Sequence, residues 1–186
     1  MTYILWLESL NNQDIDRVGG KNASLGELIS TLKSEGIQVP NGFAITADAY
    51  WAFIDANQMS ASVQGQMTAF QQGVQSLAQT GKAIRRLFQT AAFPDDLEAA
   101  IRQAYRDLSQ RYGVAEVDTA VRSSATAEDL PDASFAGQQE TFLNISGEAE
   151  LLEACRKCYA SLFTNRAISY REEKQFDHMN VALSIG

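Results

Sequence analysis

Residues 18–27 read Val18-Gly19-Gly20-Lys21-Asn22-Ala23-Ser24-Leu25-Gly26-Glu27, and they carry the chain from a polar turn into a helix. The apolar residues that follow the turn recur at intervals of three and four, as on one face of a helix: Leu25, Leu28, Ile29 and Leu32. Gly36 is a typical helix stop. The pattern predicts an amphipathic helix whose start contains two glycines and a lysine.

The Gly-Gly-Lys turn is the first candidate for a binding site. Helix N-termini carry free amide groups and a partial positive charge, so they bind anions, and Lys21 adds a full charge. The turn is not the phosphate-binding P-loop, because Ile15 and Asn22 stand where that motif needs glycine and a hydroxyl residue. From the residues alone, an ordinary turn with a solvated lysine is the alternative.

The second candidate is the segment after a strand expected over 119–124, which ends at Arg122-Ser123-Ser124 and is followed by a polar loop as far as Gly137. Arginine offers a fixed fork of donors to phosphate oxygens. Small residues in the loop would let backbone amides approach a ligand closely. These features predict a phosphate clamp, and the alternative is a surface loop with a ladder of acids.

Three acids of that loop, Glu128, Asp129 and Asp132, could bind magnesium, because carboxylates suit a hard cation. We expect them instead to order the loop or to remain solvated.

The remaining periodicity predicts an α/β chain. Strands are expected at 3–8, 43–46, 119–124, 141–145 and 181–185. Helices are expected at 47–57, 60–80, from Pro94 to Gly113, 147–163 and 165–176, with Asn165 capping the last. Nothing follows the final strand, so we expect an unpaired edge that favours aggregation and a chain that is cut off there.

Composition narrows the functional classes. The chain has 186 residues, a net charge of −8 and a sequence pI of about 4.6. This charge argues against broad binding to nucleic acid or to anionic membranes, both of which attract Lys and Arg. The sequence has no apolar run of about 18 residues and no basic region of a signal peptide at its start, so the expected location is the cytoplasm.

The cysteine pair and the single histidine are expected to have structural rather than functional roles. Cys155 and Cys158 form a C-x-x-C inside a helical pattern, and a zinc site needs about four ligands. We therefore expect two reduced cysteines without metal, with Cys155 on the buried face of the helix. His178 is the single histidine and is expected to be structural or at the surface.

Four stretches together resemble one enzyme family. They are Val18–Glu27, Val39–Thr46, Arg122–Asn144 and Leu162–Arg171. In this order and near this spacing they are similar to phosphoenolpyruvate synthases (pyruvate, water dikinases), and the stretch after Arg122 is the most specific part. Pyruvate, phosphate dikinase and rifampin phosphotransferase share the framework.

The resemblance implies an ATP-grasp fold of two halves, with ATP between them. Residues 1–186 match only the amino-terminal portion, with a helical insert at about 57–115. Lys21 and Arg122 are then expected to contact the ATP phosphates. The segment Ala133–Gln139 is similar to the mobile loop that closes over the triphosphate, so its Ser134, Gly137 and Gln138 are expected to bind ATP as well.

The resemblance also implies what lies outside this chain. The Mg²⁺ ligands belong to the second half of the domain, and the phosphohistidine and the pyruvate-binding barrel belong to further domains. The implied reaction converts pyruvate, ATP and water to phosphoenolpyruvate, AMP and phosphate. No catalytic residue and no turnover are expected of this chain by itself. The alternatives are a non-catalytic ATP-binding or regulatory module, or the ATP-binding part of a related dikinase or phosphotransferase.

Overall fold

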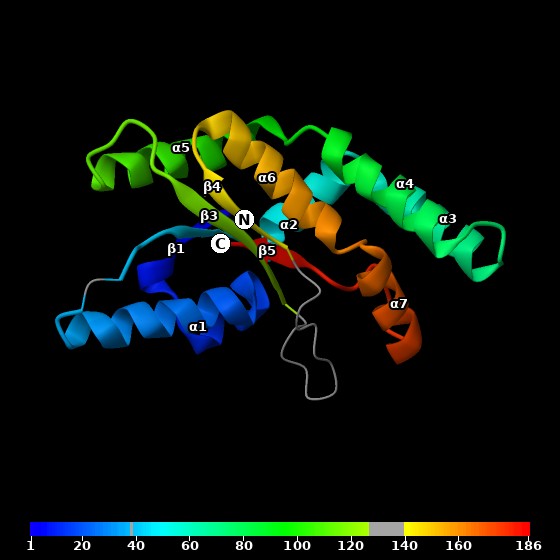
Figure 1. The fold of residues 1–186 in the computed structure, drawn as a ribbon, viewed down its shortest axis with the longest axis horizontal. Coiled ribbons are helices and arrows are strands. Elements are labelled where there is room, and N and C mark those ends of the chain that lie inside the picture. The colour runs from blue at the N-terminus through cyan, green and yellow to red at the C-terminus, as the bar shows by residue number, and fades with distance from the viewer. Residues whose placement is uncertain (38, 127–139) are drawn as a thin grey trace.

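The computed structural model describes residues 1–37, 39–126 and 140–186, which form a five-stranded sheet flanked by helices (Figure 1). The strands lie in the order β1-β2-β5-β3-β4, and each neighbouring pair is antiparallel. Their bounds are β1 Ile4–Trp6, β2 Phe43–Ile45, β3 Thr119–Ala125, β4 Thr141–Ile145 and β5 Leu183–Ile185. The expected mixture of strands and helices is confirmed.

Seven α-helices and two 3-10 helices are found in the described part of the chain. The α-helices are α1 Ile15–Ser34, α2 Ala47–Ala56, α3 Met59–Gln71, α4 Leu77–Thr90, α5 Asp95–Arg111, α6 Glu148–Ser161 and α7 Asn165–Lys174. The 3-10 helices are η1 Leu7–Ser9 and η2 Asn12–Asp14. None of the described helices is long and apolar enough to cross a membrane.

The alternation of side chains along the strands separates two layers of core. On one face of the sheet, Phe43, Ile45 and Val121 join a large apolar cluster with residues of α2, α5 and α6. On the other face, Ala44 packs in a smaller cluster between the sheet and α1. Figure 1 shows α1 below the sheet and α4, α5 and α6 above it. The residues of β3 that face α1 are therefore held against the start of that helix.

The expectation of an unpaired strand at 181–185 is wrong. Residues 183–185 form β5, which lies between β2 and β3 and pairs with both. Leu183 and Ile185 are buried in the large cluster, and Ser184 is buried on the α1 face. Because both edges of β5 are hydrogen-bonded where the strand is formed, the aggregation argued from bare backbone groups loses its basis.

The expected helix over 60–80 is also wrong, because the chain breaks between α3 and α4. Gly73 has φ +72, a left-handed conformation that ends α3, and Val74 is 74% exposed rather than in the core. Ser76 and Gln79 then form a capping box that starts α4. The intervals of three and four that run through the break are coincidental.

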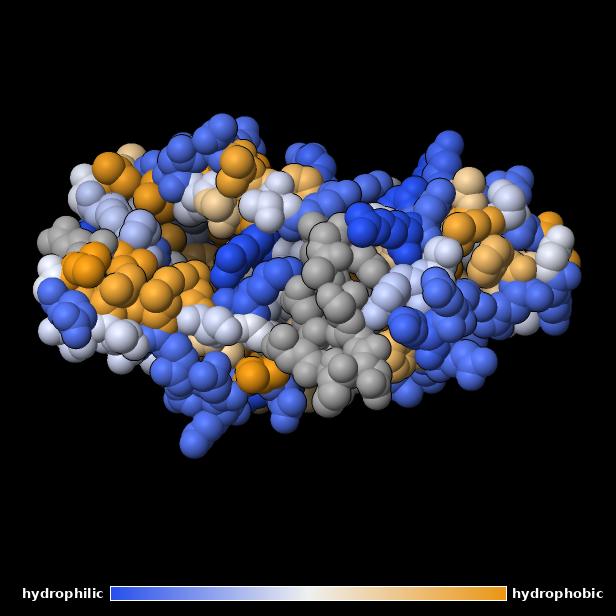
Figure 2. All heavy atoms as spheres, turned by 60° about the horizontal axis from the view of Figure 1, so that its bottom comes forward, coloured by the Kyte–Doolittle hydropathy of each residue, from blue (hydrophilic) through white to orange (hydrophobic). Residues whose placement is uncertain are grey.

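Two smaller expectations need correction. On α1 the buried face is formed by Ala23, Gly26 and Ile29, whereas Leu28 is 48% exposed. Toward the left end of the face that carries α1, hydrophobic atoms gather at the surface (Figure 2). The cap of α7 is the Thr164 side chain, which accepts from the Ala167 amide, rather than Asn165.

The cysteine pair lies deeper than expected. Both Cys155 and Cys158 are free and fully buried in α6, so the helix has no solvent-facing thiol. Burial raises the pKa of Cys155 to about 12, and burial together with the neighbouring Cys155 raises the pKa of Cys158 well above its usual value.

Candidate functional site

The start of α1 has a sharp bend at Gly19. Its φ of 72 and ψ of 160 interrupt the helix, so the long segment of α1 effectively begins at Gly20. A Cβ at Gly19 would lie 2.6 Å from the Ser124 carbonyl oxygen and would also collide with the Ser124 hydroxyl. Only glycine fits both the positive φ and this close approach to β3. The bend places the turn that contains Lys21 beside the end of β3.

Arg122 and Lys21, which are 101 positions apart in the sequence, meet at this point. The Arg122 guanidinium donates from Nη2 to the main-chain carbonyl of Lys21 at 3.0 Å. Arg122 lies on the α1 face of β3, in register with Ser124 two residues further along the strand. Both cationic side chains are half-buried rather than enclosed. The fold therefore brings together the two residues that the sequence singled out.

A buried polar cluster fastens this turn to the sheet. The Asn22 amide N–H donates to the Ser124 hydroxyl at 3.3 Å, and its side-chain Nδ2 donates to the Ser184 hydroxyl at 3.2 Å. Ser184 in turn donates to the Ile45 carbonyl at 2.7 Å. Asn22, Ser124 and Ser184 are fully buried, so α1 is tied to β3 and β5, and through Ser184 to β2. The position of Lys21 is consequently set by three strands.

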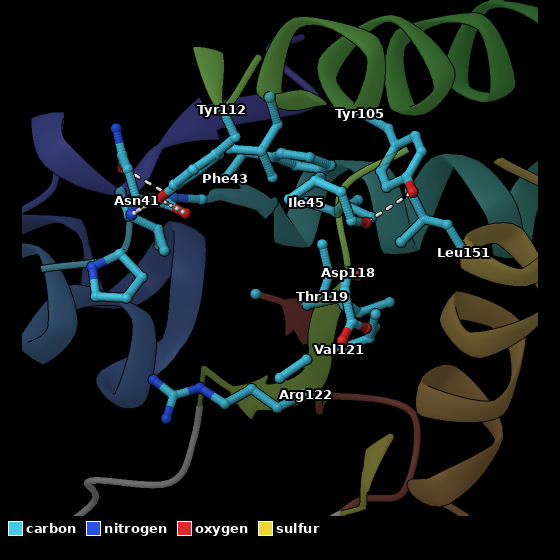
Figure 3. Close-up of a pocket in the computed structure, with 18 of the residues that line it drawn as sticks. Asn41, Phe43, Ile45, Tyr105, Tyr112, Asp118, Thr119, Val121, Arg122 and Leu151 are labelled. Carbon is cyan, nitrogen blue, oxygen red and sulfur yellow. Dashed lines mark hydrogen bonds between the residues drawn. The ribbon is translucent and has the colours of Figure 1, made fainter. Parts of the chain in front are cut away.

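Beside this point lies a cavity of about 780 Å³ between β2 and β3. Its walls are largely apolar, and they include Phe43, Tyr112 and Leu151, with Arg122 at one end (Figure 3). Figure 3 shows Arg122 reaching away from the apolar residues toward the α1 ribbon. A cationic edge beside an apolar hollow has the mixed character of a ligand site.

The other residues expected to bind ATP, Ser134, Gly137 and Gln138, lie outside the described residues. The same holds for Glu128, Asp129 and Asp132, the acids considered as magnesium ligands. Within residues 1–37, 39–126 and 140–186, no group of three or more His, Cys, Asp or Glu side chains could hold a metal ion. The described part of the site thus offers two cations, Lys21 and Arg122, and backbone donors.

His178 is 7% exposed and belongs to a separate buried network. Its Nδ1 accepts from Arg171 Nε at 2.9 Å, so the ring proton lies on Nε2, which faces Glu172 at 2.7 Å. Arg171 is 1% exposed, and burial lowers its pKa to about 10, which leaves it charged at neutral pH. These contacts give His178 a structural role in joining α7 to the segment before β5.

Sequence reasoning missed the cluster that supports the two cations. In the sequence, Asn22 stands out only as the residue that does not fit the P-loop motif, and Ser124 only as the last residue of the expected strand 119–124. A signal for Ser124 was present, because residues two apart on a strand share a face, so Arg122 and Ser124 had to face the same neighbour. No comparable signal linked Asn22 to Ser184, since their hydrogen bond spans 162 positions.

Comparison with known proteins shows which proteins this chain is similar to. The family described as pyruvate phosphate dikinase, AMP/ATP-binding domain, matches residues 15–186. A phosphoenolpyruvate synthase of Helicobacter pylori is 51% identical over 189 residues, which cover 100% of this chain and 23% of that protein. Another, of Neisseria meningitidis, is 51% identical over 185 residues, covering 99% of this chain and 23% of that protein.

A more distant relative is the probable phosphoenolpyruvate synthase of Methanocaldococcus jannaschii, which is 46% identical over 185 residues. There the match covers 99% of this chain and 15% of the relative. The chain thus spans about a quarter or less of the length of these relatives, in their amino-terminal portion.

Proposed function

Because the chain belongs to the family of pyruvate phosphate dikinase AMP/ATP-binding domains, we propose that it forms the first part of the ATP-binding domain of a phosphoenolpyruvate synthase. In this proposal the fold is the amino-terminal portion of an ATP-grasp domain, and α3 to α5 form a helical insert within it. ATP lies between this portion and a second half. The complete enzyme converts pyruvate, ATP and water to phosphoenolpyruvate, AMP and phosphate.

The observation that carries the proposal is the hydrogen bond from Arg122 to the Lys21 carbonyl, which holds two cations at the start of the long segment of α1. Phosphoryl transfer depends mainly on positioning and on stabilising charge on the phosphate oxygens. Arg122 would supply a planar fork of donors, Lys21 a point charge, and the first amides of the helix further donors. Ser134, Gly137 and Gln138 would complete the phosphate contacts.

The phosphoryl acceptor is proposed to be a histidine on another part of the enzyme. His178 is the single histidine of the 186 residues, and both of its ring nitrogens are engaged inside the protein. A buried imidazole with two partners has no free nitrogen to attack a phosphoryl group. Mg²⁺, when bound with ATP, would neutralise phosphate charge, and its ligands are proposed to lie in the second half.

Calorimetric titration of this chain with ATP tests the proposal. We expect measurable binding, and a loss of roughly tenfold or more in affinity for Lys21→Ala and for Arg122→Ala, because hydrogen bonds to charged groups contribute about 1.5–3 kcal/mol. Arg122→Lys should not restore the affinity, since lysine lacks the planar fork.

The matched control is Arg86→Ala, which removes an exposed cation from α4, an element that contributes no residue to the site. Its affinity for ATP should equal that of the unchanged chain. Equal affinity of Arg122→Ala and Arg86→Ala, or no binding by the unchanged chain, would contradict the proposal.

A further inference from the structure

The long segment of α1 has no capping side chain at its own N-cap position. Helix starts usually carry serine, threonine, asparagine or aspartate there, and the side chain accepts a hydrogen bond from an amide two or three residues further on. In α1 this position falls on Gly19, because the helix resumes at Gly20 after the bend. The φ of 72 and ψ of 160 at Gly19 lie in a region essentially restricted to glycine. A side-chain cap for this helix start therefore has to come from another part of the fold.

Ser124 of β3 takes the place of the absent capping side chain. The amide of Asn22, three residues after Gly19, donates to the Ser124 hydroxyl at 3.3 Å. A Cβ at Gly19 would collide with this same hydroxyl. The Ser124 oxygen thus lies where the side chain of an N-cap residue would begin, and it accepts the bond that such a side chain would accept. The helix is capped by a strand 102 positions away in the sequence.

Ser124 and Arg122 act on one peptide unit of α1. The carbonyl of Lys21 and the N–H of Asn22 belong to the same peptide bond. Arg122 Nη2 donates to that carbonyl at 3.0 Å, and the Ser124 hydroxyl accepts from that N–H. The two side chains are two residues apart on β3, so they lie on the same face of the strand. Together they hold both polar groups of this peptide and fix the direction in which α1 starts.

The Ser124 hydroxyl is enclosed by the protein. Ser124 and Asn22 are both 0% exposed. Ser124 therefore supports the start of α1 from behind, and any effect that it has on a ligand passes through the helix. Without Ser124 the Asn22 amide would be buried with no acceptor, which is unfavourable enough to displace the first turn of α1.

We propose that Ser124 is a positioning residue for phosphate binding. It caps α1 from the neighbouring strand, and so holds the first turn of the helix, with Lys21 in it, in the orientation that receives a phosphate group. The inference rests on the proposed function, because it assigns Ser124 a role at the same site. When the cap is lost, the first turn adopts other conformations, and only the fraction of molecules with the turn in place binds. The apparent affinity then falls although the fold is kept.

The test compares Ser124→Ala with Ser109→Ala at a temperature at which both variants are folded. Ser109 of α5 is a matched control, because it is 2% exposed and its hydroxyl accepts from the Val117 amide at 3.1 Å. Each variant loses one buried hydroxyl that accepts from one amide. We expect Ser124→Ala to weaken the binding of inorganic tripolyphosphate, measured by calorimetry, by about threefold or more. Ser109→Ala should leave this binding unchanged.

A second measurement uses the unchanged chain and does not depend on how a variant folds. If the cap supports the bound state, bound tripolyphosphate stabilises the cap in return, because the coupling between two sites is reciprocal. Saturating tripolyphosphate should therefore slow hydrogen exchange at the Asn22 amide more than at the Val117 amide.

The outcomes separate this inference from the proposed function. If tripolyphosphate binds the unchanged chain and Lys21→Ala weakens that binding, equal affinities of Ser124→Ala and Ser109→Ala would overturn the inference alone. Equal slowing of exchange at the Asn22 and Val117 amides would do the same. No binding to the unchanged chain, or binding that Lys21→Ala leaves unaltered, would contradict the proposed function and the inference with it.

Discussion

At Gly19 a single residue decides where the helix start lies. Its backbone is left-handed, and the space that a side chain would need is occupied by Ser124 of β3. The Asn22 amide and the Arg122 guanidinium make their contacts across this same junction. A change at Gly19 should therefore act on stability and on the cationic pair together.

We predict that Gly19→Ala lowers the free energy of unfolding by at least about 2 kcal/mol more than Gly36→Ala. Gly36 is a matched control, since its φ is +76 and a methyl group there would have no atom within 4 Å. A positive φ strains an L residue at both positions, and at Gly19 the ψ of 160 lies in a region essentially restricted to glycine, so the difference measures the collision with Ser124 together with that added backbone strain. Urea unfolding of both variants provides the comparison, and equal losses would contradict this account of the bend.

The titration of His178 makes the stability of the folded chain depend on pH, and the direction of this dependence follows from its pKa. Burial lowers the pKa of His178 below its ordinary value, and the charge of Arg171 lowers it further, whereas Glu172 and Asp177 raise it. The unfolded chain, with an ordinary histidine pKa of about 6.5, therefore takes up the proton first as the pH falls. The stabilisation is complete above about pH 6.5 and is lost as the pH falls toward the lower pKa of the folded state.

We predict that the free energy of unfolding is smaller at pH 5.5 than at pH 7.5, and that His178→Gln removes most of this difference. Glutamine keeps an acceptor and a donor but does not titrate. The carboxyl groups that do not contact His178 titrate alike in both proteins, whereas Glu172 loses a partner that lowers its pKa. Urea unfolding at the two pH values measures the effect, and an unchanged difference in His178→Gln would assign it to other groups.

At the scale of elements, α6 buries both of its cysteine side chains in the core. The large apolar cluster includes Cys155 and Cys158 together with Tyr159, whose ring packs edge-on against Tyr50 and at a tilt against Phe53. The raised pKa values keep both thiols protonated near neutral pH. The helix must leave the core before either sulfur can react.

We predict that the native chain at pH 8 reacts with a disulfide reagent at least about 1,000-fold more slowly than the urea-unfolded chain, which exposes both thiols. The sequence has two cysteines, so the unfolded chain must react with two equivalents of the reagent, and this sets the end point of the assay. Rapid reaction of one equivalent under native conditions would show that α6 is not packed as described.

Local patterns predicted elements best where the signal was short-ranged. The strand at 141–145 and the start of α5 after Pro94 follow from alternation and from proline and acids at a helix start. The break between α3 and α4 was missed, because the periodicity continues through Gly73 and hides the glycine's role as a stop. The central place of β5 could not be predicted, since its partners β2 and β3 are far from it in the sequence.

At the scale of the whole molecule, the fold class and the identity of Lys21 and Arg122 as candidates could be predicted from the sequence. Their hydrogen-bonded juxtaposition could not be derived from spacing, because it depends on β3 and α1 meeting across the sheet. The buried Asn22–Ser184 bond likewise arises only from tertiary packing. Physical reasoning from the sequence thus found the charged groups, whereas the supporting polar cluster had to be seen in three dimensions.

The central claim is that the site formed by Lys21 and Arg122 recognises phosphate groups. The most direct measurement is calorimetric titration of the chain with ATP, inorganic tripolyphosphate and adenosine under one buffer condition. We predict that tripolyphosphate competes with ATP, that both bind with a dissociation constant of about 1 mM or tighter, and that Arg122→Ala weakens both alike, whereas adenosine binds far more weakly. Adenosine binding as tightly as ATP, with tripolyphosphate unable to compete, would contradict the claim.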